Sequence, residues 1–196
     1  MPQDLPRRAE RLIDRWFGPP GDPEREAERK IWFESTPEFD AALRAEFLAD
    51  HEAGVAGRLV SWEERPGSAL ALVLLLDQIP RNIFRGSPSA YASDALARAA
   101  ADRALARGFD RVVPPAWRGF FYLPFEHSED LADQERAMAL FACLPPTLEY
   151  PDPLRHARRH HEIIARFGRF PHRNVVLGRP STPAELAFLA EPDSSF

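Results

Sequence analysis

Polar side chains that can bind anions or transfer protons gather in three short stretches of the chain, residues 74–86, 121–135 and 167–178. In each stretch they stand among aromatic and apolar residues, and natural chains tend to break local patterning rules where they do something other than fold. Guanidinium groups bind carboxylate or phosphate through paired N–H donors. An imidazole beside a carboxylate can accept and return a proton. The three stretches therefore predict a site for an anionic small molecule, with hydrolysis or another proton transfer as the chemistry to test.

Two sets of side chains make up this predicted site. The candidates for acid–base catalysis are Asp77, Glu126, His127 and His172, with the carboxylates orienting the imidazoles. The candidates for ligand binding are Gln78, Arg81, Asn82, Arg85, Glu129, Arg169, Arg173 and Asn174. The four arginines of this second set would hold the anion. The prediction requires the three stretches to converge in the folded chain, and it leaves open whether the protein is an enzyme.

The same side chains also have a purely structural interpretation. Asp77 is expected at the C-terminal end of a helix, where the helix dipole disfavours a carboxylate unless Arg81 or Arg85 compensates it. An Asp–Arg pair of this kind can simply lock a turn. Glu126 and His127 are expected just before a helix that Ser128 opens, where the dipole favours a neutral imidazole but where such residues are also ordinary capping material. Sequence alone does not separate the two interpretations.

The motifs of common cofactor and metal sites are missing from the sequence. His160, His161 and His172 could suggest a metal, but adjacent residues of a helix point about 100° apart, and the spacing matches no established zinc pattern. The chain has no glycine-rich phosphate-binding motif and no Gly-x-Ser-x-Gly nucleophile elbow. We therefore predict neither a metal nor a cofactor.

Composition indicates a globular protein with an acidic surface. The chain has 196 residues, 44% hydrophobic content and a net charge of −5, with 24 Arg to a single Lys, a ratio that genome composition explains as well as function does. The segment 154–179 is rich in arginine, and acidic residues of 126–135 are its expected partners. The acidic total argues against nucleic-acid binding. The longest apolar run, 69–76, is too short to span a bilayer, and no apolar leader opens the chain, so we expect a cytoplasmic protein without membrane contact.

Helix signals recur along the chain, whereas alternation typical of strands does not persist. Ser or Thr followed by Pro predicts helix starts near residues 36, 87 and 182, and Ser128 predicts a fourth. Glycines at 18, 108 and 168 predict helix ends. A buried central helix is expected near residues 67–78, because its sequence is apolar on every side. Most tryptophans and phenylalanines, and the single Cys143, are expected in the core.

These patterns predict an all-α protein with a single domain over residues 1–196, built as a bundle of antiparallel helix pairs. Three long motifs of the sequence are LLDQIPRNIFRG, YLPFEHSEDLADQE and FGRFPHRNVVLGR, and two shorter ones are Trp16-Phe17-Gly18 and Trp32-Phe33. In these motifs the sequence resembles the bacterial family called domain of unknown function 924. The resemblance implies a helical fold related to tetratricopeptide repeats and a polar cluster formed by the twelve candidate residues above. It implies no reaction.

A tetratricopeptide-like fold supports a second function from a different class. Helix pairs of that kind can present a groove to a peptide or protein partner, and the three motifs would then serve only as structural locks between helices. Substitutions in the motifs would lower stability under this alternative, whereas they would abolish binding or turnover under the first.

Overall fold

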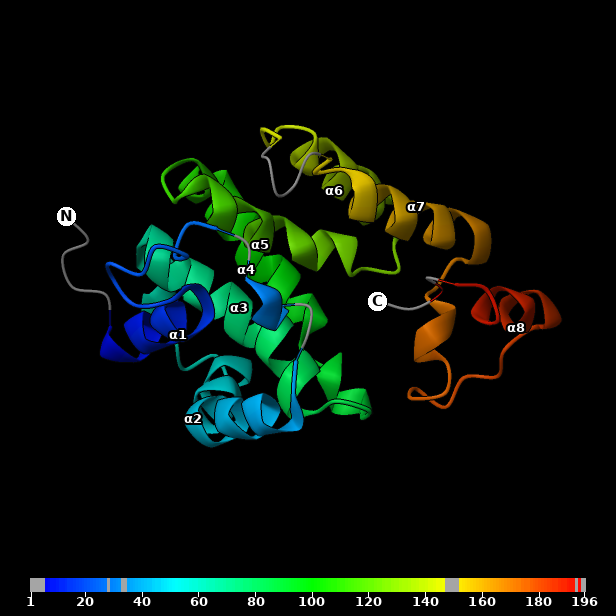
Figure 1. Cartoon of the computed structure of the whole chain (residues 1–196), viewed down its shortest axis with the longest axis horizontal. Coiled ribbons are helices and arrows are strands. Elements are labelled where there is room, and N and C mark those ends of the chain that lie inside the picture. Colours follow the sequence, from blue (N-terminus) through cyan, green and yellow to red (C-terminus); the bar gives the residue numbers. More distant parts are fainter. Residues whose placement is uncertain (1–5, 28, 33–34, 147–151, 193, 195–196) are drawn as a thin grey trace. The chain divides into compact units, whose positions relative to one another are not determined.

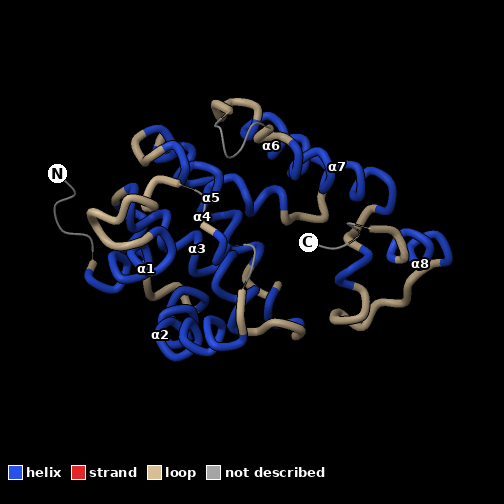
Figure 2. Tube along the Cα trace, viewed as in Figure 1, coloured by secondary structure: helices blue, strands red, loops and turns tan. Residues whose placement is uncertain are grey.

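The computed structural model describes residues 6–27, 29–32, 35–146, 152–192 and 194. These residues form helices, turns and loops, and none of them lies in a strand (Figures 1 and 2). The prediction of an all-α helical fold is confirmed. The relation to tetratricopeptide repeats stays a prediction.

The chain forms two compact units. Unit 1 comprises residues 1–85 and 89–124, and unit 2 comprises residues 86–88 and 125–196. That the whole chain acts as one domain stays a prediction, and each unit is described by itself below. The α-helices are α1 (Arg7–Phe17), α2 (Pro37–Val55), α3 (Pro66–Ile83), α4 (Asp94–Ala106), α5 (Pro115–Glu126), α6 (Leu131–Phe141), α7 (Arg155–Phe167) and α8 (Pro183–Leu189). Short 3₁₀ helices lie at Lys30–Trp32, Val60–Glu64, Pro88–Ala90, Phe109–Arg111 and Pro171–Arg173.

Helix α3 is the core of unit 1, as its apolar sequence predicts. Every residue from 68 to 77 is buried, and α1, α2 and α4 pack against it (Figure 1). Because its sequence is apolar on all sides, this helix is stable only when other helices cover it completely. The expected central helix is therefore confirmed, but it is longer than predicted and continues to Ile83.

The extra turn of α3 passes through Pro80, which has no N–H to donate to the carbonyl of Leu76. The Ser93 hydroxyl donates to that carbonyl instead, at 2.6 Å. At the preceding residue, a ring nitrogen of His51 on α2 lies 3.0 Å from the carbonyl of Leu75. Side chains from outside the helix thus satisfy carbonyl groups beside the proline, which is what allows a proline inside a buried helix.

Several predicted helix ends are confirmed. Thr36 caps α2 through its side chain, Thr182 and Glu185 form a complete capping box on α8, and Gly168 ends α7 in the left-handed region at φ 68°. A glycine is needed at this last position because residues with a Cβ are strained there.

Two predicted helix starts are wrong. Helix α4 begins at Asp94 and not after Ser87, since Pro88–Ala90 forms a separate 3₁₀ turn. Helix α6 begins at Leu131 with Asp130 as its cap, whose side chain accepts from the N–H of Ala132 at 2.8 Å. Ser128 lies outside this helix and donates to Asp133 at 2.6 Å.

Aromatic residues fill the rest of the unit 1 core, as expected. The rings of Phe17 and Trp117 stack with centroids 4.3 Å apart, and Trp16 and Phe120 pack edge to face. Phe33, which the sequence also placed there, lies outside the described residues. Cys143 was expected in the core, but it is exposed because α6 ends at Phe141.

Unit 2 has its own small core. Helices α6 and α7 pack side by side (Figure 1). Ile163 and Ile164 of α7 meet Phe170 and Phe188 in a buried cluster. In the described part of the chain, no helix combines the length and apolarity needed to cross a membrane.

The hydrogen bond from Ser93 to Leu76 generates a stability prediction. Ser93→Ala leaves a buried carbonyl without this donor and should lower the free energy of unfolding by about 1–3 kcal/mol, measured by urea denaturation. In a Pro80→Ala background the new N–H can bond to Leu76, so the same Ser93→Ala change should then cost less. Equal costs in both backgrounds would show that the hydroxyl does not replace the missing N–H.

Candidate functional site

The first motif lies in unit 1, where it forms a chain of charges around Arg81. The guanidinium of Arg81 donates to both carboxylate oxygens of Asp94, at 2.9 and 3.1 Å, and lies 3.3 Å from the carboxylate of Asp77. Asp77 is fully buried and also accepts from Gln78 at 2.6 Å. One arginine therefore links two carboxylates, one on α3 and one at the start of α4. Asp77 was expected at the end of its helix, but α3 continues to Ile83, so the burial of its carboxylate and not the helix dipole requires this cation.

The other two residues of the first motif join α3 to the start of α2. Asn82 donates to Asp40 at 2.7 Å and to Ser35 at 3.0 Å, and the Arg85 fork donates to both oxygens of Asp40 at 2.7 and 3.2 Å. Burial alone would raise the pKa of Asp40, but the bonds from Arg85, Ser35 and Asn82 outweigh it and lower the pKa. Arg81 and Arg85 are thus already engaged by carboxylates of their own unit.

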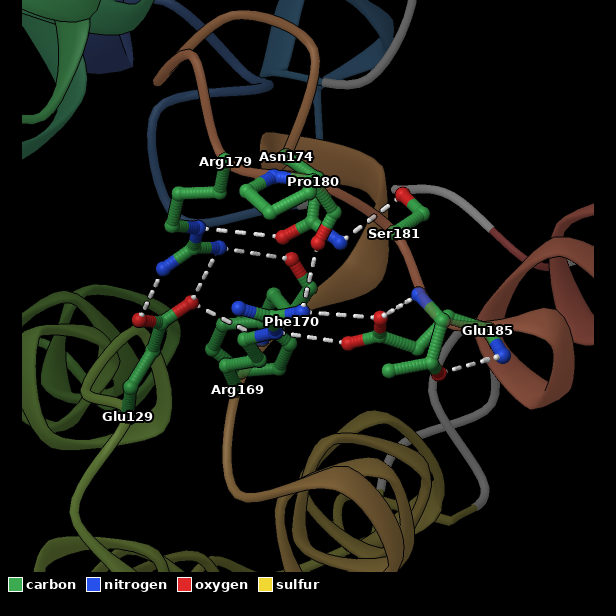
Figure 3. Close-up of polar contacts among 9 residues, drawn as sticks. Glu129, Arg169, Phe170, Asn174, Arg179, Pro180, Ser181 and Glu185 are labelled. Atoms are coloured by element: carbon green, nitrogen blue, oxygen red, sulfur yellow. Dashed lines mark hydrogen bonds and ion pairs between the residues drawn. The ribbon is translucent and has the colours of Figure 1, made fainter.

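The second and third motifs meet in unit 2, where Glu129 joins them (Figure 3). One oxygen of its carboxylate accepts from the backbone N–H of Phe170 at 2.8 Å, and the fork of Arg179 binds both oxygens at 2.6 and 3.0 Å. Arg179 also donates to Asn174 and to the carbonyl of Phe170, each at 3.0 Å. Asn174 is fully buried and donates to Ser181. This cluster fixes the loop that carries His172.

Arg169 holds the same loop from the other side. Its fork binds both carboxylate oxygens of Glu185 at 2.6 and 2.9 Å, and it donates to the carbonyl of Pro180 at 2.9 Å (Figure 3). Glu185 also accepts from the N–H of Thr182 within the capping box. The bond from Arg169, together with those from Thr182, lowers the pKa of Glu185 to about 2. Arg169 therefore fastens α8 to the loop after α7.

Glu126 and His127 follow a helix, whereas the sequence analysis placed them before one. Glu126 is the last residue of α5, so the end of the dipole nearest to His127 is negative, and the predicted dipole argument for a neutral His127 is wrong. Gln134 of α6 fixes this turn instead. Its fully buried amide donates to the carbonyls of Glu126 and Ser128, at 2.6 and 2.7 Å, on either side of His127.

Two imidazoles, those of His160 and His172, lie against Phe170 in unit 2, and a third, that of His127, lies beside His160. We call His127, His160 and His172 the histidine cluster. The ring centroids of His127 and His160 lie 6.2 Å apart. Phe170 lies 5.4 Å from His160 and 5.6 Å from His172, again between centroids. The guanidinium of Arg173 lies over the same phenylalanine, 4.6 Å from its centroid, and this arginine is only 6% exposed. A cation and three titratable rings thus share one buried region.

Burial and neighbouring positive charge keep two of these imidazoles neutral. Burial lowers the pKa of His172 to about 4, with the charge of Arg173 as the next cause. Burial also lowers the pKa of His160 to well below its usual value, and His127 and Arg173 add to the effect. At neutral pH both rings are therefore uncharged and able to accept a proton.

The structure brings two of the three predicted motif stretches together. Residues from 126–129 and 169–174 share one site in unit 2, whereas 77–85 forms its own cluster in unit 1. That all three stretches converge stays a prediction. A surface depression of about 360 Å³ lies on α1 in unit 1, between Arg7 and Asp14, and none of the predicted site residues lines it. Among the described residues, no group of three His, Cys, Asp or Glu side chains is placed to hold a metal ion.

Comparison with known proteins identifies the family. Residues 12–193 match the family model described as bacterial protein of unknown function, DUF924. The chain belongs to this family. It is also 43% identical to a solved structure of a protein of unknown function from Agrobacterium tumefaciens, with a TM-score of 0.84 over 95% of this chain and 99% of that one. No curated protein matches the chain. These similarities confirm the family resemblance read from the three motifs and name no activity.

The expected pairing of acidic residues of 126–135 with the arginine-rich segment is confirmed by the bonds between Glu129 and Arg179. Sequence reasoning missed the other partners of the predicted residues, which are Asp40, Asp94, Gln134, His160 and Glu185. Of these, only Glu185 had a local signal, a capping box. The others lie on separate elements and carry no motif that ties them to the site.

The lowered pKa values of His160 and His172 generate a pH prediction. A group whose pKa is lower in the folded state stabilises the protein above its unfolded pKa, and this stabilisation is lost as pH falls toward the folded value. The free energy of unfolding should thus fall between about pH 6.5 and pH 4, by on the order of 2–3 kcal/mol for His172 alone. Chemical denaturation at several pH values measures it. His172→Gln should flatten this dependence, and His161→Gln, one residue from His160 on another face of α7, should leave it unchanged.

The first motif generates a prediction about stability. Arg81→Gln leaves Asp77 and Asp94 buried without their shared cation and should lower the free energy of unfolding by on the order of 3 kcal/mol. Arg58→Gln, the same change at an exposed position, is the control and should cost less than about 0.5 kcal/mol. If both variants unfold at the same urea concentration, Arg81 is not a lock.

Proposed function

We propose that unit 2 binds a small anionic molecule at the histidine cluster, with Arg173 holding the anion and the neutral imidazoles exchanging protons with it. The observation that carries the proposal is the placement of Arg173, His160 and His172 around one buried phenylalanine, with His127 beside His160. Buried polar groups are costly to keep, and titratable groups with strongly lowered pKa values concentrate at functional sites. Structural ion pairs account for the other motif arginines described above, but they do not require a group of neutral imidazoles.

This proposal narrows the set of anion-binding residues. The sequence suggested four arginines, but Arg81, Arg85 and Arg169 are each bound by a carboxylate that also stabilises the fold. A ligand would have to displace those carboxylates to use them. We assign the anion to Arg173 because its guanidinium lies over Phe170 within the histidine cluster, and we interpret the other three as structural locks.

The acid–base assignment of the sequence analysis is also narrowed. Asp77 is buried in unit 1 and engaged by Gln78 and Arg81. Of the sequence candidates, those in unit 2 that suit proton transfer are His127 and His172, with Glu126 as a carboxylate of the same unit. The proposed chemistry is therefore hydrolysis or another proton transfer on an anionic substrate.

Anion binding can be tested with inorganic phosphate and malonate, titrated by calorimetry at low ionic strength and neutral pH. We expect saturable binding of at least one of them, and resonances of His127 and His172 should shift during the same titration followed by NMR. Arg173→Gln should weaken binding ten- to hundredfold, because a charge-assisted bond contributes about 1.5–3 kcal/mol.

The matched control is Arg155→Gln, which removes the same charge from the exposed start of α7 in the same unit. It should change the affinity less than threefold. Circular dichroism must show that Arg173→Gln is folded, and Arg173→Lys, which keeps the charge but loses the fork, should bind with intermediate affinity. Equal loss in Arg155→Gln and Arg173→Gln, or no saturable binding of either anion, would overturn the proposal.

A further inference from the structure

His160 is held by two acceptors at one ring nitrogen. Its Nδ1 lies 2.9 Å from the backbone carbonyl of His156, one turn earlier on α7, and 3.2 Å from a carboxylate oxygen of Glu126. A carbonyl oxygen can only accept a hydrogen bond. The proton of the neutral ring is therefore on Nδ1, which leaves Nε2 as the proton-accepting nitrogen.

We infer that Glu126 and His160 form the acid–base dyad of unit 2, with His160 as the proton acceptor and Glu126 as its positioning residue. This inference rests on the proposed function for the bound anion and goes beyond it by assigning the base to a residue outside the sequence candidates. Glu126 and His160 are 3% and 5% exposed, so the carboxylate acts on the ring through a region from which water is largely excluded.

The geometry has the elements of an oriented base. A carboxylate that accepts from Nδ1–H fixes the tautomer and the orientation of an imidazole, and it stabilises the imidazolium that forms when Nε2 takes a proton. In the proposed step, Nε2 of His160 takes a proton from the bound molecule or from a water that attacks it. The cation that results keeps its Nδ1–H on Glu126 and His156, and the proton returns from Nε2 to the product.

Charged and titratable groups from several elements act on this ring. They are Glu126 at the end of α5, His127 in the turn after it, His156 on α7, and Arg173 on the 3₁₀ helix 171–173. Burial, together with the charge of Arg173, keeps the resting ring neutral, whereas Glu126 favours its protonated form. Removing the charge of Glu126 should therefore make His160 a weaker base without removing the ring.

The test uses diethyl pyrocarbonate, which acylates only an unprotonated imidazole nitrogen, with the modified residues identified by mass spectrometry. In the native full-length protein we expect acylation of His160 with a rate that rises with pH. Glu126→Gln preserves the shape and an acceptor oxygen but not the charge. It should slow this acylation about tenfold and move the midpoint of its pH profile downward, which a merely structural role would not do.

Glu162→Gln is the matched control, because it makes the same change at an exposed residue of α7. It should alter neither the rate nor the midpoint. Long-range ¹H–¹⁵N spectra of the unliganded protein report the tautomer directly and should show the proton on Nδ1. A proton on Nε2, a His160 that the reagent does not reach in the folded protein, or equal rates in Glu126→Gln and wild type would each overturn the dyad.

Phosphate separates this inference from the proposed function. If both hold, saturating phosphate should slow the acylation of His160, because the anion occupies the same site. If His160 reacts as expected but phosphate neither binds nor slows its acylation, the proposed anion site is wrong and the dyad of Glu126 and His160 is still supported.

Discussion

Carboxylates taken out of water must each be matched by a cation with the right shape, and this requirement organises both units. Among the described residues, five forked pairs meet it, between Asp94 and Arg81, Asp40 and Arg85, Glu63 and Arg103, Glu129 and Arg179, and Glu185 and Arg169. Each pair joins segments that are distant along the chain, with both oxygens engaged. A guanidinium can make two parallel bonds of this kind and an ammonium cannot. The structure thus gives a physical role to these arginines, whose excess over lysine the sequence left equally open to genome composition and to function.

Local rules predicted those parts of the fold in which a side chain acts on its own neighbourhood. The caps at Thr36 and Thr182 and the glycine after α7 needed only residues three or four positions away, and the apolar run of α3 needed only its own composition. The rules failed where a serine had a partner elsewhere. Ser93 bonds to the carbonyl of Leu76, seventeen residues earlier, and thereby allows α3 to continue through Pro80. No pattern around either residue indicates that bond.

In the candidate site, too, local sequence patterns were predictive, whereas contacts between distant segments were not. The motif stretches were found because they mix arginine, histidine and acidic side chains with aromatics, but the sequence could not indicate which carboxylate meets which cation. His160 was set aside because adjacent histidines on a helix do not readily share one ion, which argues against a metal and says nothing about a pair with Glu126. That pair depends on the end of α5 meeting the middle of α7, a contact between elements that spacing does not encode.

The imidazoles of the site and the carboxylates that hold its loops take up protons at different pH values, and this difference separates their roles. His160 and His172 are held as neutral rings, so the stability that they contribute begins to fall once the pH drops below about 6.5. The carboxylates that fix the two loops of the site have lowered pKa values, with Glu185 near 2 and Glu129 below its usual value despite its burial. Glu185 therefore stays charged near pH 4, where His172 takes up its proton. Moderate acid should therefore disrupt the histidine cluster while Arg169 and Glu185 still hold the loop after α7. This is the behaviour expected when one set of residues stabilises the fold and another set, buried at a cost in free energy, performs the chemistry.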